Sequence, residues 1–470
     1  MAYDNHTYLS PFTWRYGSQA MRRIWSEVNK RILMRRVWVA LAKAQHRAGL
    51  VSLDQMQDLE KHQEDIDIGR AREIEKDVRH DVVAEIRTYA EQCSVGGSII
   101  HWGLTSADVT DNVDALRMRD ALRLTIEHLE KLLAVLADRI EELAGLPVMG
   151  YTHIQPAEPT TLGYRFAVYG QDLLQDLTAL QGQEVGIQGK GLKGAVGTQA
   201  AFEEMLVGTG VSAVEMEAEA MAFLELPYFP IATQVYSRKQ DFQILNVLAD
   251  LGASLHKFAM DFRIMQSPAF GELSEPFGKS QTGSSAMPFK QNPIISENIC
   301  SLTRYIAGLP AVAWDNASQS ILERTLDDSA NRRIILPEAF LAIEQCLMQA
   351  EGLITGMTVD KDAVQRNLDR FGQISALERV FTALVSAGAD RQNAHQWLRD
   401  ASIAAGDSTM GDQASPLKER LLSNKDIAGY LSEEQIEALL SSDSYTGTAE
   451  TRALDLVKRI RYRIGSHSPG

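Results

Sequence analysis

Residues 283–293 hold the densest set of chemically useful side chains in the chain, reading Gly-Ser-Ser-Ala-Met-Pro-Phe-Lys-Gln-Asn-Pro. Pro288 and Pro293 exclude a regular helix between them, so the run is predicted to be a loop. An apolar helical pattern resumes from Ile294 to Leu309. A loop at the start of a helix presents hydroxyls, an ammonium group and backbone N–H groups, all of which stabilise negative charge.

Four further polar clusters interrupt sequence that is otherwise helical, at residues 79–82, 101–112, 150–161 and 323–333. Taken singly, each has an ordinary explanation, because Asp, Ser and Thr are common N-caps and Arg332-Arg333 could form a solvated face. A single histidine is more often structural than catalytic. Six histidines outside these clusters are assigned to structure: His6, His46, His62, His128, His395 and His467.

Together the clusters resemble a known family. The loop matches the pattern Gly-Ser-Ser-x-Met-Pro-x-Lys-x-Asn-Pro of the fumarase/aspartase superfamily at every fixed position, and Thr105-Ser106 and Thr152-His153 resemble its other two shared segments. Residues 10–16, 79–81, 234–239 and 323–333 resemble the adenylosuccinate lyase branch in particular. The resemblance extends over nearly the whole chain.

The resemblance implies cleavage of a C–N bond by β-elimination of fumarate, from adenylosuccinate to give AMP and from the succinylated aminoimidazole carboxamide ribotide (SAICAR) to give AICAR. Ser284 matches the base and His153 the acid, with Glu297 holding that histidine. Lys290 would stabilise the serine alkoxide, and His80 would be the second histidine of the site. No metal and no cofactor is implied.

The implied ligand is an anionic purine nucleotide, which arginines bind well because their guanidinium groups pair with carboxylates and phosphates. In the family a second basic residue usually follows the loop lysine, but this chain has Gln291 there. Position 298, which is Asn in this chain, is Arg in some members of the family and Asn in others. The positions that match substrate-binding residues are Arg15, Tyr16, Arg79, Asp81, Thr105, Ser106, Gln234, Asn292, Asn298, Arg324, Ser329 and Arg333.

The bulk composition restricts the class of protein. Of 470 residues, 45% are hydrophobic and 23% charged, and the formal net charge is −15. An acidic chain of this kind argues against nucleic-acid and membrane-surface binding. Its three scattered cysteines form no paired framework or metal spacing, which favours a reducing compartment. With a polar N-terminus lacking a signal core, a cytoplasmic protein is expected.

The elements that must position these groups are long helices. Leu122, Ile126, Leu129, Leu133 and Leu136 begin a heptad seam that runs to Leu143 and is stopped by Gly145 and Pro147. Further helical stretches are predicted at 164–180, 237–265, 294–319 and 333–353. Residues 189–194 fit a dinucleotide fingerprint by spacing, but no strand precedes them, so that interpretation is rejected.

The fold class predicted is all-α, with domains at residues 1–110, 111–358 and 359–470. The resemblance implies a central bundle of long helices that forms a 20-helix core in a homotetramer, with each active site shared between subunits. Helices rise about 1.5 Å per residue, so one chain would hold the polar clusters roughly tens of ångströms apart. The alternatives are a sister lyase, such as a 3-carboxy-muconate cycloisomerase, and a non-catalytic protein on the same scaffold, such as a lens crystallin.

Overall fold

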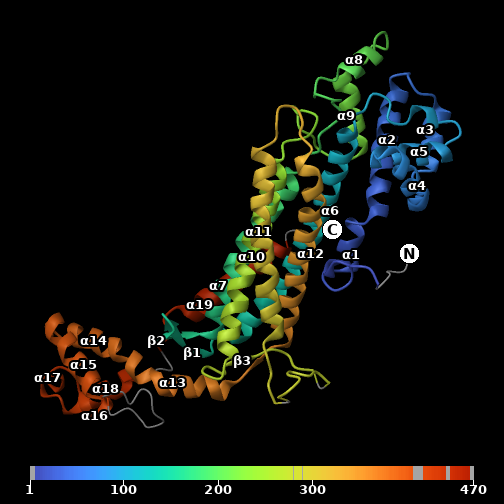
Figure 1. Ribbon diagram of the computed structural model, residues 1–470. Coiled ribbons are helices and arrows are strands. Elements are labelled where there is room, and N and C mark those ends of the chain that lie inside the picture. The colour runs from blue at the N-terminus through green and yellow to red at the C-terminus, as the bar shows by residue number, and fades with distance from the viewer. Residues whose placement is uncertain (1–5, 279, 288, 406–416, 441–444, 466–470) are drawn as a thin grey trace. The chain divides into compact units, whose positions relative to one another are not determined.

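The computed structural model describes residues 6–278, 280–287, 289–405, 417–440 and 445–465 (Figure 1). Pro288 of the predicted loop therefore lies outside the described residues. The strands are β1 (Pro147–Thr152), β2 (Gln155–Thr161), β3 (Leu273–Ser274) and β4 (Thr358–Val359), and the 3₁₀-helices are η1 (Pro11–Thr13) and η2 (Gly97–Ile99).

Helices make up most of the rest. They are α1 (Gln19–Ile24), α2 (Glu27–Arg47), α3 (Leu53–Lys61), α4 (Ile68–Val78), α5 (Asp81–Gln92), α6 (Ser106–Leu143), α7 (Leu162–Gly186), α8 (Ala200–Met205), α9 (Ala213–Phe223), α10 (Lys239–Gln266), α11 (Ile294–Ser318), α12 (Asp327–Gly356), α13 (Lys361–Ser375), α14 (Leu377–Ser386), α15 (Arg391–Ala405), α16 (Leu417–Ser423), α17 (Lys425–Ala428), α18 (Glu433–Leu440) and α19 (Ala449–Gly465).

The predicted helices are confirmed, and six of the eight ends predicted for α7, α10, α11 and α12 lie within three residues of those observed, whereas α7 continues six residues beyond its predicted end at 180. The heptad seam lies in α6, which ends at Leu143, before Gly145 and Pro147. Helix α11 starts at Ile294, directly after Pro293. Helix α12 begins at Asp327, one and a half turns before the predicted start, because Asp327 and Asp328 are favourable in a first turn.

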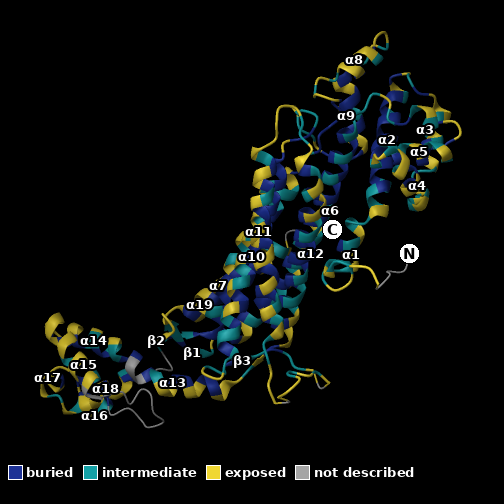
Figure 2. Ribbon diagram, viewed as in Figure 1, coloured by how far each residue is buried: buried dark blue, intermediate teal, exposed yellow. Residues whose placement is uncertain are grey.

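The chain divides into two compact units. The first contains residues 1–129, 176–253 and 302–347, and the second contains residues 130–175, 254–301 and 348–470. Each unit takes one segment from each of the five long helices α6, α7, α10, α11 and α12. These helices have buried faces along their length (Figure 2), as expected for helices whose apolar stripes pack together.

Both units have substantial apolar cores. In the first, Trp38 and Phe202 belong to a cluster of buried side chains that come mainly from α2, α5, α6, α8 and α9. In the second, Leu133, Leu136 and Ile140 of the seam are completely buried, and a separate cluster lies among α14 to α18. The seam is therefore a packing feature, as the sequence indicates.

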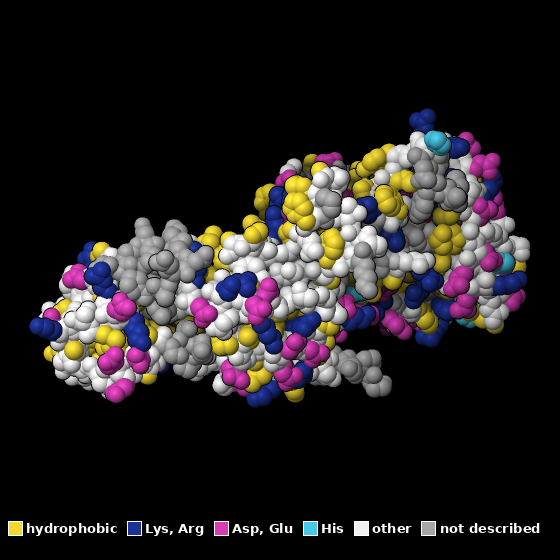
Figure 3. All heavy atoms as spheres, turned by 90° about the horizontal axis from the view of Figure 1, so that it is seen from below, with side chains coloured by type: hydrophobic (Ala, Val, Ile, Leu, Met, Phe, Trp, Pro, Cys, Tyr) yellow, Lys and Arg dark blue, Asp and Glu magenta, His cyan; other side chains and the backbone are white. Residues whose placement is uncertain are grey.

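The face drawn in Figure 3 shows no continuous patch of basic side chains among the described residues. Lys and Arg side chains lie interspersed with Asp and Glu over the face drawn in Figure 3. None of the described helices is long and apolar enough to cross a membrane.

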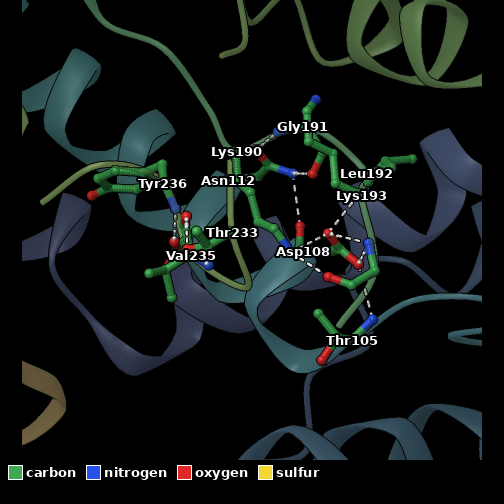
Figure 4. Close-up of polar contacts among 12 residues, drawn as sticks. Thr105, Asp108, Asn112, Lys190, Gly191, Leu192, Lys193, Thr233, Val235 and Tyr236 are labelled. Atoms are coloured by element: carbon green, nitrogen blue, oxygen red, sulfur yellow. Dashed lines mark hydrogen bonds and ion pairs between the residues drawn. The ribbon is translucent and has the colours of Figure 1, made fainter. Parts of the chain in front are cut away.

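A buried carboxylate fixes the start of α6. Asp108 accepts hydrogen bonds from the Lys190 ammonium at 2.6 Å, from the Lys193 backbone N–H at 2.9 Å and from the Thr105 backbone N–H at 2.9 Å (Figure 4). Asp108 and Lys190 are both completely buried. The helix start is thereby tied to residues 189–194.

The same turn is held at two further points. Asn112 donates to the Gly191 carbonyl at 3.0 Å and accepts from its N–H at 3.1 Å, while Glu217 pairs with the Lys193 ammonium. The Gly-rich run at 189–194 is thus a polar turn packed on α6. Within the described residues no strand–helix–strand unit surrounds it, in agreement with rejection of the dinucleotide motif.

Replacing Asp108 with Ala is expected to lower the free energy of unfolding by about 3–5 kcal/mol, because it leaves the Lys190 charge buried without its partner. Urea denaturation measures the change. The matched control is Asp138→Ala, which removes an exposed partner of Arg461 and should cost less than about 1 kcal/mol. Equal losses for the two variants would contradict this account of the turn.

Candidate active site

A polar cavity in the first unit contains four of the predicted substrate-binding residues. It has a volume of about 170 Å³, and Asp81, Arg324, Ser329 and Arg333 line it. Ser329 and Arg333 lie in the first two turns of α12, and Asp81 begins α5. Six Lys and Arg side chains and four Asp and Glu side chains line the cavity, so cations outnumber carboxylates here although the chain as a whole is acidic.

Asp81 joins two cations at the edge of this cavity. Its carboxylate lies 3.3 Å from the Lys30 ammonium and 3.2 Å from the Arg333 guanidinium. Burial alone would raise the pKa of Asp81, but Lys30 and Arg333 hold it below its ordinary value. Asp81 is therefore ionised and orients both cations.

Two of the residues that line the cavity are buried arginines, and sequence reasoning did not identify either as a site residue. Arg238 makes a two-pronged contact with Asp111 at 3.0 and 3.1 Å, and also binds Asp328 at 2.6 Å. Arg332 binds Asp241 at 2.6 Å. Arg332-Arg333 is thus not a solvated face, since only Arg333 is exposed.

The charge on Arg238 is retained despite its burial. Burial and the neighbouring Arg332 would each lower the pKa of Arg238, but Asp111, Tyr236 and Asp241 together raise it above its ordinary value. The Tyr236 hydroxyl completes the network by donating to Asp241 at 2.6 Å and accepting from Arg332 at 2.8 Å.

A second corner of the first unit brings His80 and Ser106 together. Arg79 ends α4 in the left-handed conformation (φ 52°), and this reversal makes His80 the N-cap of α5. His80 Nδ1 accepts from the Val83 N–H at 3.4 Å, and its Nε2 lies 3.4 Å from the Ser106 hydroxyl. Arg79 and His80 are exposed.

His101 lies close to this corner and was not predicted as a site residue. Its Nδ1 accepts a hydrogen bond from the Trp38 indole at 3.1 Å. Burial, with a smaller contribution from His80, lowers the pKa of His101 to about 4. His101 is therefore neutral near pH 7, and its positive φ of 67° marks a constrained backbone.

The other predicted residues of this unit are held mainly through the backbone. The Gln234 N–H donates to the Glu323 carbonyl at 3.2 Å, and the Thr105 N–H donates to Asp108. The Arg15 guanidinium is exposed and lies 5.9 Å from the centre of the Tyr16 ring.

In the second unit, His153 occupies the tip of a β-hairpin that the sequence did not predict. Strands β1 and β2 pair antiparallel, with Thr152 opposite Gln155, so His153 and Ile154 form a two-residue turn. Both have positive φ, 55° and 60°, as a type I′ turn requires. This conformation is unfavourable for a β-branched residue such as Ile154, at about 1–3 kcal/mol.

The base of the hairpin is tied down strongly enough to hold such a turn. The Arg165 guanidinium donates to the Met149 carbonyl at 2.6 Å and pairs with the buried Glu272 at 3.2 Å. Tyr151 packs edge-on against Phe270, with ring centres 4.8 Å apart. His153 itself is exposed at the tip.

The loop between β3 and α11 presents Ser284 with two backbone donors. The Ser284 Oγ accepts from the N–H of Met287 at 3.1 Å and of Ala286 at 3.4 Å. Asn292 closes the loop by donating to the Gly283 carbonyl at 3.1 Å. A side chain on Gly283 would collide with the Lys290 carbonyl, so this close turn requires glycine.

Both ends of this loop are anchored by residues that sequence reasoning missed. Glu275, just before the loop, caps α11 by accepting from the N–H groups of Ile295 at 2.9 Å and Ser296 at 2.8 Å. Gln266 accepts from the Glu275 N–H at 2.9 Å and donates to the Gln291 carbonyl at 3.3 Å. Gln266 therefore holds the two ends of the loop close together.

Glu297 lies in the first turn of α11 and is exposed. Its carboxylate lies 3.7 Å from the Arg263 guanidinium. Among the described residues of this unit, no hydrogen bond joins Glu297 or Ser284 to His153. The Oδ1 of Asn298 is buried without a hydrogen-bond partner in the described chain, and Lys290 is exposed.

Comparison with known proteins places this arrangement in a family. A family model described as Lyase matches residues 7–308, and one described as Adenylosuccinate lyase C-terminus matches residues 374–454. The chain is 37% identical to adenylosuccinate lyase of Schistosoma mansoni, covering 89% of this chain and 88% of that protein. It is 36% identical to adenylosuccinate lyase of Saccharomyces cerevisiae, covering 97% and 95% respectively.

Solved structures agree on the fold. The crystal structure of fumarate lyase from Mesorhizobium sp. BNC1 has a TM-score of 0.84 at 24% identity, covering 96% of this chain and 99% of that chain. That of 3-carboxy-cis,cis-muconate lactonizing enzyme from Pseudomonas putida has a TM-score of 0.83 at 25% identity, with the same coverage. The all-α fumarase/aspartase-like fold is confirmed, and the chain belongs to the adenylosuccinate lyase family.

Proposed function

We propose that this chain catalyses β-elimination of fumarate from adenylosuccinate, giving AMP, and from SAICAR, giving AICAR. A base removes a proton from the succinyl Cβ, and the electron pair is held as an aci-carboxylate. The bond between the succinyl Cα and nitrogen then breaks, and an acid protonates the departing nitrogen. One proton is taken up by the base and one is delivered by the acid, so the proton count of the enzyme is unchanged, and transfer of a proton from the base to the acid through solvent after product release restores its starting state.

The hydrogen bonds to Ser284 carry this proposal. Serine is a weak base unless negative charge on its oxygen is stabilised. Two backbone N–H groups, of Ala286 and Met287, already point at Oγ and would do this when the proton is lost. The exposed Lys290 is free to approach as the loop closes over substrate, and exclusion of water would strengthen its effect.

His153 is proposed as the acid. An imidazole suits proton delivery at neutral pH because its ordinary pKa is close to 7. The strained hairpin turn projects it outward, and strain of this kind is typical of functional positions. Glu297 is proposed to hold the imidazole, with His80 as the second histidine.

The cavity of the first unit is proposed to bind the anionic parts of the substrate. Arg324 and Arg333 supply charge, and Ser329 at the start of α12 supplies a hydroxyl. Further proposed contacts come from Arg15, Tyr16, Arg79, Asp81, Thr105, Ser106, Gln234, Asn292 and Asn298. This local set allows an acidic protein to bind a highly charged nucleotide.

A homotetramer with shared active sites is proposed, because His153 projects from its hairpin and no hydrogen bond joins it to Glu297 or Ser284 among the described residues of its own unit. A second subunit would bring these residues together. The central domain would span residues 111–358, between domains at 1–110 and 359–470. The three cysteines, all thiols within the described residues, favour the cytoplasm.

Purified protein supplied with adenylosuccinate is expected to release AMP and fumarate, and supplied with SAICAR to release AICAR and fumarate. The change in ultraviolet absorbance follows both reactions, and chromatography identifies the products. Absence of both products from folded protein would refute the assignment, and turnover of 3-carboxy-muconate instead would favour the sister-lyase alternative.

Ser284→Ala is expected to lower kcat by about 10²–10⁴-fold with little change in KM, because a positioned base is lost while substrate contacts remain. Steady-state kinetics measure both constants. Ser285→Ala is the matched control, since it removes the adjacent hydroxyl, and it should keep most of the activity. Full turnover by Ser284→Ala would contradict the proposed base.

Mixing His153→Ala and Ser284→Ala subunits is expected to restore activity that neither variant has. If the two residues of a site come from different chains, random reassembly gives roughly a quarter of the sites both wild-type residues. The two variants are unfolded together, refolded and assayed beside each variant refolded alone. Failure of properly assembled hybrids to recover activity would contradict shared sites.

A further inference from the structure

A buried carboxylate on α12 lies outside the proposed chemistry and binds the N-terminal segment. Glu344 is completely buried, and it accepts from the Ser18 N–H at 2.7 Å and from the Ser18 hydroxyl at 2.7 Å. His128 of α6 lies behind it, with Nε2 3.3 Å from the carboxylate. All three residues belong to the first unit.

The backbone just before Ser18 is held as well. The Gly17 N–H donates to the Gln345 side chain at 3.0 Å. The Arg22 guanidinium donates to the carbonyls of Tyr16 at 3.0 Å and Gly17 at 2.9 Å. Gly17 has a φ of 79°, a conformation that favours glycine. The chain from Tyr16 to Ser18 therefore has one fixed course.

This fixed course is more than an ordinary helix cap requires. Ser18 caps α1 by itself, because its Oγ accepts from the Met21 N–H at 3.0 Å. Adding a buried carboxylate carries a desolvation cost that a neutral residue would avoid. Burial would raise the pKa of Glu344, but His128 and Ser18 together lower it, so the charge persists.

The segment held in this way includes one proposed substrate contact, Tyr16, and directly follows another, Arg15. Arg15 and Tyr16 directly precede Gly17, and the Arg15 guanidinium is exposed beside the Tyr16 ring. We propose that Glu344, backed by His128, is a positioning residue that fixes Ser18 and thereby orients Arg15 and Tyr16 for the anionic substrate. The proposal rests on the proposed function for the role of Arg15 and Tyr16, whereas the holding of the segment does not depend on it.

The first test is a double-mutant cycle in the full-length enzyme. Glu344→Gln is expected to raise KM for adenylosuccinate about tenfold, the effect of misplacing one charge-assisted contact, with kcat within about twofold of wild type. In an Arg15→Ala, Tyr16→Phe background the same change should add little, because the two groups being oriented are gone. Equal increases in both backgrounds would overturn the proposal.

Ser18→Ala and Ser18→Thr provide a second route if Glu344→Gln folds poorly. Ser18→Ala should raise KM, as Glu344→Gln does. Ser18→Thr keeps the hydroxyl and should have the KM of the wild type. Tyr89→Phe is the control for loss of a buried hydrogen bond, here to the Leu59 carbonyl, and should leave KM unchanged. A loss of thermal stability in Ser18→Ala without any change in KM would mean a merely structural role and would overturn the proposal.

Amide hydrogen exchange separates this inference from the proposed function. Glu344→Gln should speed exchange of the Gly17 and Ser18 amides about tenfold or more relative to those of α2, whether or not the protein turns over adenylosuccinate. If the wild type lacks lyase activity but Glu344→Gln still speeds exchange of these two amides, the proposed function fails, whereas the conclusion that Glu344 holds the segment stands. If exchange is unaffected, the holding itself is refuted.

Discussion

The network around Arg238 and Arg332 is the constraint on which the first unit depends. Two buried guanidinium groups are stable only if carboxylates compensate their desolvation, and Asp111, Asp241 and Asp328 do so. These acids come from α6, α10 and α12, so the pairing fixes the start of α12 against the other two helices. Arg333 directly follows Arg332 in α12 and is exposed. Its backbone is therefore fixed by this network, and its side chain can contact a ligand without rearrangement.

The second unit keeps its proposed catalytic groups in place by different means. The tip of its hairpin and much of its loop are exposed, and both depend on polar anchors at their bases. Arg165 with Glu272 secures the hairpin, and Glu275 with Gln266 secures the loop. Anchors at the base leave the tips exposed, which a site closing over its substrate requires.

The sequence predicted what depends on local pattern. The α6 seam and the start of α11 follow from helical periodicity and from proline, and the Ser284 loop follows from its residue types. The hairpin was missed because Pro156 and Pro159 weaken a strand pattern and no glycine marks its turn. Arg238 was missed as a structural centre because its partner Asp111 is 127 residues away, and no local signal encodes such a pair.

Charge placement unites these observations. A chain with a net charge of −15 cannot attract a polyanionic ligand through its overall field, so binding must depend on cations held at fixed points. Free arginines at a surface would lose side-chain entropy on binding, whereas arginines already paired with Asp81 or Asp328 have lost it on folding. Asp81 and Asp328, which add to the net negative charge, therefore also hold the arginines of the proposed binding site in place.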